Sequence, residues 1–240
     1  MKRLLVLSAL AAAAVLACFH PSASASPAGV TRPRVTGPFT RIDLRSPVDV
    51  FVHEGRPLAV SLTTKVISPD KVVTRVEGDA LIIEIKNDWC IGNCPQEQSA
   101  RLDIDTPVLN GVKISGSGDV AVVGAGTHAK LDLAVTGSGD IRYSGAADLV
   151  SCSVEGSGDV TLSGSGKRIQ AKLEGSGDVD ARAFAVSGGA FEIDGSGDVT
   201  ADLHGGDTTI RIHGSGDLHY SGEARITSLE IEGSGEVSRL

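Results

Sequence analysis

Near its middle the chain reads Leu131-Asp132-Leu133-Ala134-Val135-Thr136-Gly137-Ser138-Gly139-Asp140-Ile141-Arg142-Tyr143, and the tetrad Gly-Ser-Gly-Asp within this stretch recurs along the second half. Successive copies start 19 to 21 residues apart. A fixed period of this size is typical of repeat proteins, in which each structural unit stacks on its neighbours. The copies begin at Gly116, Gly137, Gly156, Gly175, Gly195, Gly214 and Gly233, and the last of them ends in Glu236 instead of Asp.

Apolar and polar residues alternate around each tetrad. In the stretch quoted above, the odd positions carry Leu, Val, Ile, Tyr and both glycines, whereas the even positions are mostly polar and include Ser138 and Asp140. This alternation indicates strands with one buried face. We therefore expect both glycines to point inward, and Ser and Asp to point outward.

A glycine at an inward position suits a sharp corner, because a Cβ atom there would collide or because φ must be positive. We expect two short strands per unit, joined at the Gly-x-Gly corner and closed by looser turns such as residues 124–127 and 205–208. No helical apolar spacing separates the units. The sequence therefore predicts an all-β fold, a parallel β-solenoid with coils of roughly 20 residues, and not a sheet with crossover helices.

The repeat begins before its motif becomes regular. Residues 46–49 read Ser-Pro-Val-Asp, and Asp49 falls where the repeat Asp falls. We interpret residues 39–240 as one solenoid domain, less regular over 39–115 and regular over 116–240. A separate domain over residues 39–115 is the alternative.

The first residues resemble an export signal. A charged start, Lys2 and Arg3, precedes a short apolar run, and Ala-Ser-Ala at residues 23–25 provides a cleavage site, so residues 1–25 are predicted to be a signal peptide. Residues 26–38 are interpreted as a linker. The alternative is a lipoprotein signal with Cys18 lipidated, for which Leu at residue 16 is unusual. Either version predicts an exported protein in the periplasm, at the cell surface or outside the cell, with no later membrane-spanning helix.

The charge of the chain restricts its partners. The net charge is −8, and loss of the signal peptide with Lys2 and Arg3 makes it −10. A negative surface disfavours nucleic acids and anionic lipids. Cations, basic proteins and neutral glycans remain as partners.

The four cysteines divide by position. Cys90 and Cys94 lie in a turn-rich loop of a predicted exported protein, which favours a local disulfide over two free thiols. No further Cys/His pair completes a zinc site. Trp89 in the same loop either packs over the solenoid end or forms a contact tip. Cys152 alternates in register with Val150 and Val154, so we expect a buried apolar residue.

Stacked coils would place the repeat aspartates in a column about 4.8 Å apart, where like charges repel. We expect backbone N–H groups or Ser hydroxyls to offset this repulsion by donating to the carboxylates. A row of bound Ca²⁺ ions is the alternative, although Asp follows Gly directly here, unlike in Gly-Gly-x-Gly-x-Asp β-rolls. The column comprises Asp119, Asp140, Asp159, Asp178, Asp198 and Asp217.

Catalytic motifs are missing from the sequence. No nucleophile elbow, zinc-protease helix or phosphate-binding loop occurs, so we expect no catalytic residue, no cofactor and no metal centre. His213 and His219 flank one tetrad on the outward parity, and we interpret them as incidental surface residues. Three outward arginines, which a glycan-cleaving β-helix would need in one place, recur at no fixed position: Arg142, Arg182 and Arg211.

Several short patterns accompany the serial tetrads: Phe39-x-x-Ile42, Val48-Asp49-Val50, Leu81-x-Ile83, Pro107-x-Leu109 and Ile114-Ser115 before the first tetrad. Together they resemble a bacterial exported family, the auto-transporter adhesin heads or GIN domains. The resemblance covers about residues 39–240 and implies a β-solenoid-like fold and a surface or periplasmic location. It implies no catalytic or ligand residue, and the Cys90–Cys94 loop is not part of it.

These observations predict a non-enzymatic binding or adhesion module for a surface glycan or protein. A structural, self-associating envelope protein is the second hypothesis, because the last coil near Val237 shows no capping helix and its edge could pair with another copy. A glycan-active β-helix enzyme is the third.

Overall fold

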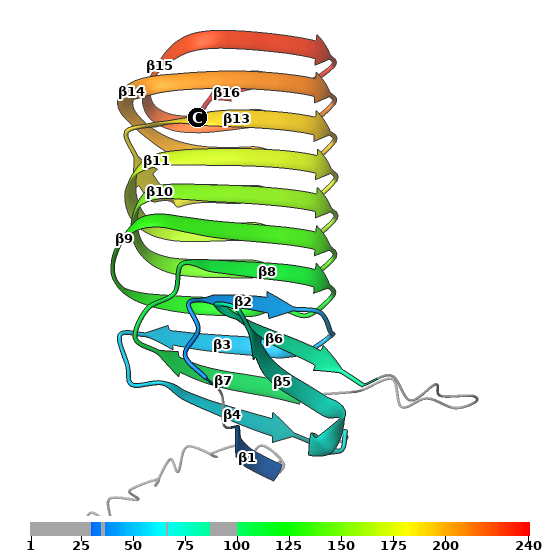
Figure 1. The fold of residues 1–240 in the computed structure, drawn as a ribbon. Helices are drawn as coiled ribbons and strands as arrows, with labels where there is room; N and C mark the ends of the chain where they lie inside the picture. The colour runs from blue at the N-terminus through cyan, green and yellow to red at the C-terminus, as the bar shows by residue number, and fades with distance from the viewer. Residues whose placement is uncertain (1–29, 35–36, 66, 87–99) are drawn as a thin grey trace, which may run out of the picture.

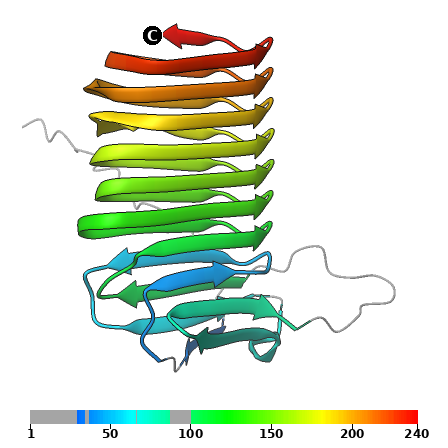
Figure 2. The ribbon, with the colours of Figure 1, turned by 45° about the horizontal axis from the view of Figure 1, so that its top comes forward.

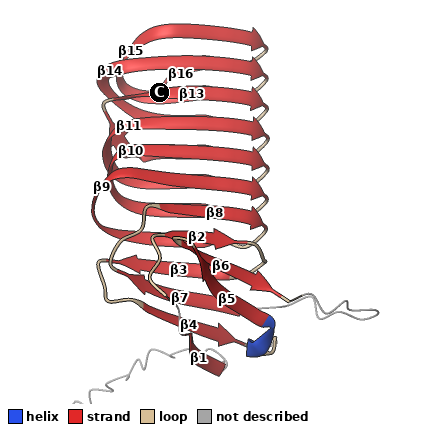
Figure 3. Cartoon of the chain, in the orientation of Figure 1, coloured by secondary structure: helices blue, strands red, loops and turns tan. Residues whose placement is uncertain are grey.

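Parallel strands stack into a single column of coils, as the tetrad period predicts (Figure 1). The structure is a computed structural model and describes residues 30–34, 37–65, 67–86 and 100–240. The predicted all-β solenoid is confirmed. The only helical element among the described residues is a short 3₁₀ turn at the end opposite β15 (Figure 3).

The regular part of the column consists of strands that run from one tetrad to the next, except that the stretch between Asp178 and Gly195 forms two strands. β16 follows β15 at the same end of the column (Figure 2). The strands are β8 (Gly111–Gly116), β9 (Val120–Gly137), β10 (Ile141–Gly156), β11 (Val160–Gly175), β12 (Val179–Val186), β13 (Gly188–Gly195), β14 (Val199–Gly214), β15 (Leu218–Gly233) and β16 (Val237–Arg239).

The second bend of most coils differs from the prediction. The looser turns expected at residues 124–127 and 205–208 lie inside β9 and β14, each of which is one bent strand. Between β14 and β15 the pairing shifts register after His204 and resumes at Asp207, next to Gly205 with φ of 79°. Continued pairing through most of the bend keeps the backbone N–H and C=O groups satisfied.

Constant register builds the core. From Ile141 opposite Val160 to Gly156 opposite Gly175, β10 and β11 pair without a shift. Inward side chains therefore stack on inward side chains of the next coil, and one aliphatic core runs through the column. The core is narrow, so its stability accumulates from coil to coil.

The two glycines of the tetrad differ in backbone conformation and in burial. The first adopts a positive φ, for example 128° at Gly137, and is only partly buried. The second is buried, and a Cβ atom on Gly139 would lie 2.2 Å from the carbonyl oxygen of Gly118 one coil earlier. The expected inward position therefore holds for the second glycine. The first is required by its backbone conformation and also by space, because a Cβ atom on Gly137 would lie 2.4 Å from the carbonyl oxygen of Gly116.

The irregular part contributes one coil of the repeat. β2 pairs in parallel with β8, and β3 pairs in parallel with β9. The N–H of Val50 donates to the carbonyl oxygen of Asp119 at 2.8 Å, which places Asp49 beside Asp119 and confirms that it occupies the repeat position. The elements are β1 (Val30–Arg34), β2 (Arg41–Leu44), β3 (Asp49–Glu54), β4 (Ala59–Thr64), η1 (Pro69–Lys71), β5 (Val72–Glu77), β6 (Ala80–Ile85) and β7 (Ala100–Thr106).

The base of the column departs from parallel stacking. β1 pairs antiparallel with β4, β4 with β7, and β5 with β6. The segment interpreted as a linker, residues 26–38, thus contains strand β1.

Three sequence predictions fall outside the described residues. They concern the signal peptide with Cys18, the Cys90–Cys94 disulfide and the Trp89 loop. Within the ranges given above, no helix has the length and apolar character needed to cross a membrane.

Candidate functional site

The repeat aspartates form a hydrogen-bonded column, which we call the aspartate ladder. Oδ1 of Asp119 accepts the backbone N–H of Asp140 at 3.0 Å, and the same contact recurs from coil to coil. Each carboxylate therefore fixes the corner of the next coil, and these bonds offset the like-charge repulsion. The acceptors are Asp119, Asp140, Asp159, Asp178, Asp198 and Asp217, and the last donor is the N–H of Glu236, at 2.7 Å.

A surface groove of about 510 Å³ crosses the second halves of the strands on another face of the column. It extends over β10, β11, β13, β14 and β15. Ser, Thr, Gln and charged side chains line it, and Phe191 is the only aromatic residue in the lining. Such a surface combines many hydrogen-bonding groups with exposed apolar area, which suits an extended ligand that has both polar groups and apolar faces.

Because the strands pair in register, the side chains that line the groove form two columns. The first, the small column, carries mostly short side chains: Ser151, Gln170, Ala190, Thr209 and Ser228. The second, the charge column, alternates in sign: Lys172, Glu192, Arg211 and Glu230. Nζ of Lys172 lies 4.0 Å from Oε1 of Glu192, and Nη2 of Arg211 lies 2.9 Å from Oε2 of Glu230.

A third column borders the groove. It consists of the residues that immediately precede the tetrad glycines, and we call it the carboxylate column: Glu155, Glu174, Asp194, His213 and Glu232. His213 is the single base within it. Nδ1 of His213 lies 3.0 Å from Oδ1 of Asp194, and Nε2 lies 3.8 Å from Oε2 of Glu232.

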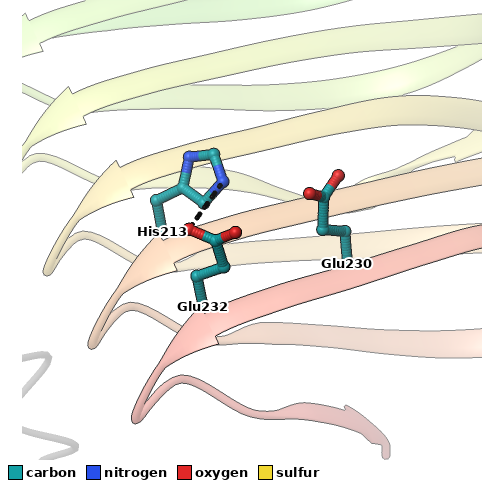
Figure 4. Close-up of side chains that lie close together, drawn as sticks. All are labelled: His213, Glu230 and Glu232. Atoms are coloured by element: carbon teal, nitrogen blue, oxygen red, sulfur yellow. Dashed lines mark ion pairs between the residues drawn. The ribbon is translucent and has the colours of Figure 1, made fainter.

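Glu230 joins this histidine from the neighbouring charge column (Figure 4). Among the residues that the structure describes, His213, Glu230 and Glu232 are the one set of three potential ligands whose ligand atoms lie within 4.8 Å of one another. All three side chains are reached by solvent. This set was not predicted from the sequence, because His213 was interpreted as an incidental surface residue. The position of His213 directly before a tetrad puts it in register with Asp194 and Glu232.

The other singled-out bases do not converge. Arg142 and Arg182 each pair with an aspartate two residues earlier on the first halves of their strands, whereas Arg211 lies in the groove. His219 contacts Ser238, and His204 contacts Asp202. The three arginines therefore lie in separate places and share no common site.

One buried polar cluster had no signal in the sequence. Glu54 at the end of β3 accepts from Leu109 N–H at 2.9 Å and contacts Nε2 of His128 at 2.8 Å. Burial, and secondarily the charge of Glu54, raise the pKa of the neighbouring Tyr143 to about 12. The cluster joins the irregular part to the first regular coil and lies away from the groove.

Cys152 is a free, buried cysteine whose side chain packs in the core, as expected from its parity. Burial raises the pKa of its thiol to about 12. A thiol in this state is inert at neutral pH and serves as a small apolar residue.

Solved structures share this fold. A putative adhesin from Bacteroides fragilis NCTC 9343 aligns with a TM-score of 0.77 and 22% identity over 90% of this chain and 98% of that chain. A putative lipid binding protein from Parabacteroides distasonis ATCC 8503 aligns with a TM-score of 0.66 and 22% identity, covering 88% of this chain and 96% of that chain. A putative adhesin from the same organism aligns with a TM-score of 0.61 and 20% identity, covering 88% of this chain and 96% of that chain.

No curated protein matches the chain significantly. The structural likenesses, at these identities, establish the fold. The family resemblance stated from the tetrads is confirmed, because the model of one family matches residues 38–224. The chain belongs to the family described as putative auto-transporter adhesin, head GIN domain.

Proposed function

We propose that this chain is an exported, non-enzymatic binding module that holds an extended polar polymer, a surface polysaccharide or a protein segment, along its groove. The observation that carries the proposal is the groove itself. It crosses five strands, and its charge column presents Lys172, Glu192, Arg211 and Glu230 in alternating order. Membership of an adhesin family supports the same function.

The chemistry of the groove favours binding over catalysis. The charged side chains of the groove pair with one another. The short side chains of the small column leave room for a ligand polymer to lie across the strands. Rigid, regularly spaced donors and acceptors cost little conformational entropy when a ligand binds. Export is supported by the sequence of residues 1–25.

A binding panel tests this function. Purified residues 26–240 are applied to surface polysaccharides and matrix proteins, and both retention and product release are measured. We expect saturable retention without cleavage. The double variant Lys172→Glu/Arg211→Glu should lose retention, because both cations line the groove.

The matched control is Arg142→Glu, which reverses an exposed charge on the other half of a coil, outside the groove. It should bind like the parent chain. Equal loss in the control and the groove variant would contradict a groove site, and product release would favour the glycan-active enzyme instead.

Self-association is the second candidate function, and one observation favours it. The inward positions of β15 are exposed, with Leu229 at 52% and Ile231 at 40%, whereas the equivalent Ile210 and Ile212 one coil earlier are buried. An exposed apolar strand edge is a template for pairing with a second copy. Sedimentation velocity at increasing concentration should then reveal a dimer that Leu229→Lys abolishes, and a monomer throughout would eliminate this candidate.

A further inference from the structure

We propose that His213, Glu230 and Glu232 bind a Zn²⁺ ion on the outer face of β14 and β15. His213 comes from β14, and the two glutamates come from the adjacent β15 (Figure 4). Their ligand atoms lie within 4.8 Å of one another. One imidazole with two carboxylates matches the ligand types that Zn²⁺ takes in proteins.

Asp194 orients the histidine for this role. Its Oδ1 lies 3.0 Å from Nδ1 of His213, which leaves Nε2 directed toward Glu232. Metal-binding histidines commonly donate their second ring N–H to a carboxylate, which fixes the tautomer and raises the basicity of the ligating nitrogen. Asp194 is therefore a positioning residue and not a ligand.

The spacing between His213 and Glu232 fits an ion better than a direct hydrogen bond. Nε2 and Oε2 are 3.8 Å apart, which is too long for a hydrogen bond. Two ligand atoms of a tetrahedral zinc ion, each at its usual bond length, lie about 3.4 Å apart. A small side-chain rotation closes this difference, and Glu230 then approaches from the neighbouring column.

The local charge also favours a dication. Asp194, Glu230 and Glu232 bring three negative charges, and Arg211, at 2.9 Å from Glu230, is the nearest guanidinium that pairs with them. The bound form of the histidine is neutral. The site would thus carry a net charge of about −2 before the ion enters, which matches Zn²⁺.

This inference does not depend on the proposed polymer binding, because the ion is measured alone. Isothermal titration with ZnCl₂ is performed on the purified protein in which Cys90 and Cys94 are changed to Ser, so that loop thiols contribute nothing. We expect one saturable site per chain. His213→Ala and Glu232→Gln should each weaken Zn²⁺ binding by about tenfold or more, and Asp194→Asn by about 10–100-fold.

The matched control is His204→Ala. His204 is also an exposed histidine beside a carboxylate, with Nε2 2.9 Å from Oδ2 of Asp202, but within the described part of the chain it belongs to no set of three ligands. Its loss should leave the titration unchanged. Circular dichroism of each variant excludes misfolding, and ring ¹⁵N shifts of His213 should report zinc on Nε2 with the proton kept on Nδ1.

Two outcomes would overturn the proposal. Zinc binding that survives His213→Ala at full strength would place the ion elsewhere, and absence of saturable binding would reduce the cluster to surface ion pairs. A parallel CaCl₂ titration separates this site from the aspartate ladder, because Ca²⁺ binding to the ladder would be unchanged in the His213→Ala variant.

Discussion

Oε2 of Glu54 and Nε2 of His128 lie 2.8 Å apart in the interior of the protein, where both side chains are almost fully buried. The two residues are 74 positions apart and belong to β3 and β9. The same carboxylate accepts the backbone N–H groups of Leu109 and Ala125. One side chain therefore joins the irregular base to the first regular coil.

Truncation of this carboxylate should be strongly destabilising. Glu54→Ala leaves His128 and two backbone N–H groups without their acceptor, and each buried donor left unsatisfied costs about 1–3 kcal/mol. Urea unfolding measures the loss. Glu54→Gln keeps the shape and an acceptor oxygen, so it should cost less. Glu155→Ala, at an exposed position of the carboxylate column, is the control, and an equal effect there would contradict this role.

The buried glycine of a tetrad should not tolerate a methyl group. A Cβ atom on Gly158 would lie 2.2 Å from the carbonyl oxygen of Gly139 and 2.8 Å from a methyl group of Val135. Overpacking of this kind costs about 1–3 kcal/mol, and backbone contacts relax poorly, so Gly158→Ala should reach the upper end. Thermal unfolding tests it against Ser157→Ala, an exposed neighbour that should be neutral.

Within the aspartate ladder, the acceptor oxygen should matter more than the negative charge. Oδ1 of Asp159 accepts the N–H of Asp178 at 2.9 Å. Asp159→Ala removes this bond at a cost of about 0.5–1.5 kcal/mol. Asp159→Asn keeps an acceptor and removes repulsion, so its free energy of unfolding should equal or exceed that of the parent. Equal losses in both variants would show that the charge itself is required.

Asp49 should make stability depend on pH. Partial desolvation first, and the neighbouring Asp119 second, raise the pKa of this carboxyl above its ordinary value, although the residue is exposed. The charged form is thus disfavoured in the folded state, a cost present at pH 7 and absent below both pKa values. Asp49→Asn should raise Tm at pH 7, and its advantage should vanish near pH 3. Destabilisation at pH 7 would contradict this sign.

Thiol counting tests the predicted disulfide. The chain after residue 25 holds three cysteines, Cys90, Cys94 and Cys152. Buried Cys152, with its raised pKa, should not react in the native protein. Unfolding without reductant should release one reactive thiol, which Cys152→Ser removes. Three reactive thiols would mean that Cys90 and Cys94 are unpaired.

The features that the sequence predicts are those set by local repetition. The tetrad period and the parity of residues such as Val150 and Cys152 determine the coil, its inward face and the aspartate ladder. The position before each tetrad also places Asp194, His213 and Glu232 in one column, so their alignment could be predicted in principle, whereas the approach of Glu230 from the next column could not.

Other features depend on contacts that no local pattern encodes. The antiparallel pairing of β1 with β4 and the contact between Glu54 and His128 join distant segments without a repeat between them. The bend inside β14 was predicted at residues 205–208 as a turn between two strands and not as part of one strand, because glycine-rich turns and bent strands have similar composition. The groove depends on how columns of different side-chain size lie next to each other, which requires the register first.

The unshifted pairing of β10 with β11 has an evolutionary consequence. Gly156 and Gly175 occupy equivalent places in successive coils, so excision of residues 157–175 would join ends that already match. A tandem duplication of the same length would do the reverse. Each event changes the height of the column by about 4.8 Å and the number of side chains displayed on its faces, while every remaining core contact is of a kind already present. A gene of this type can adjust the reach of its product in whole steps.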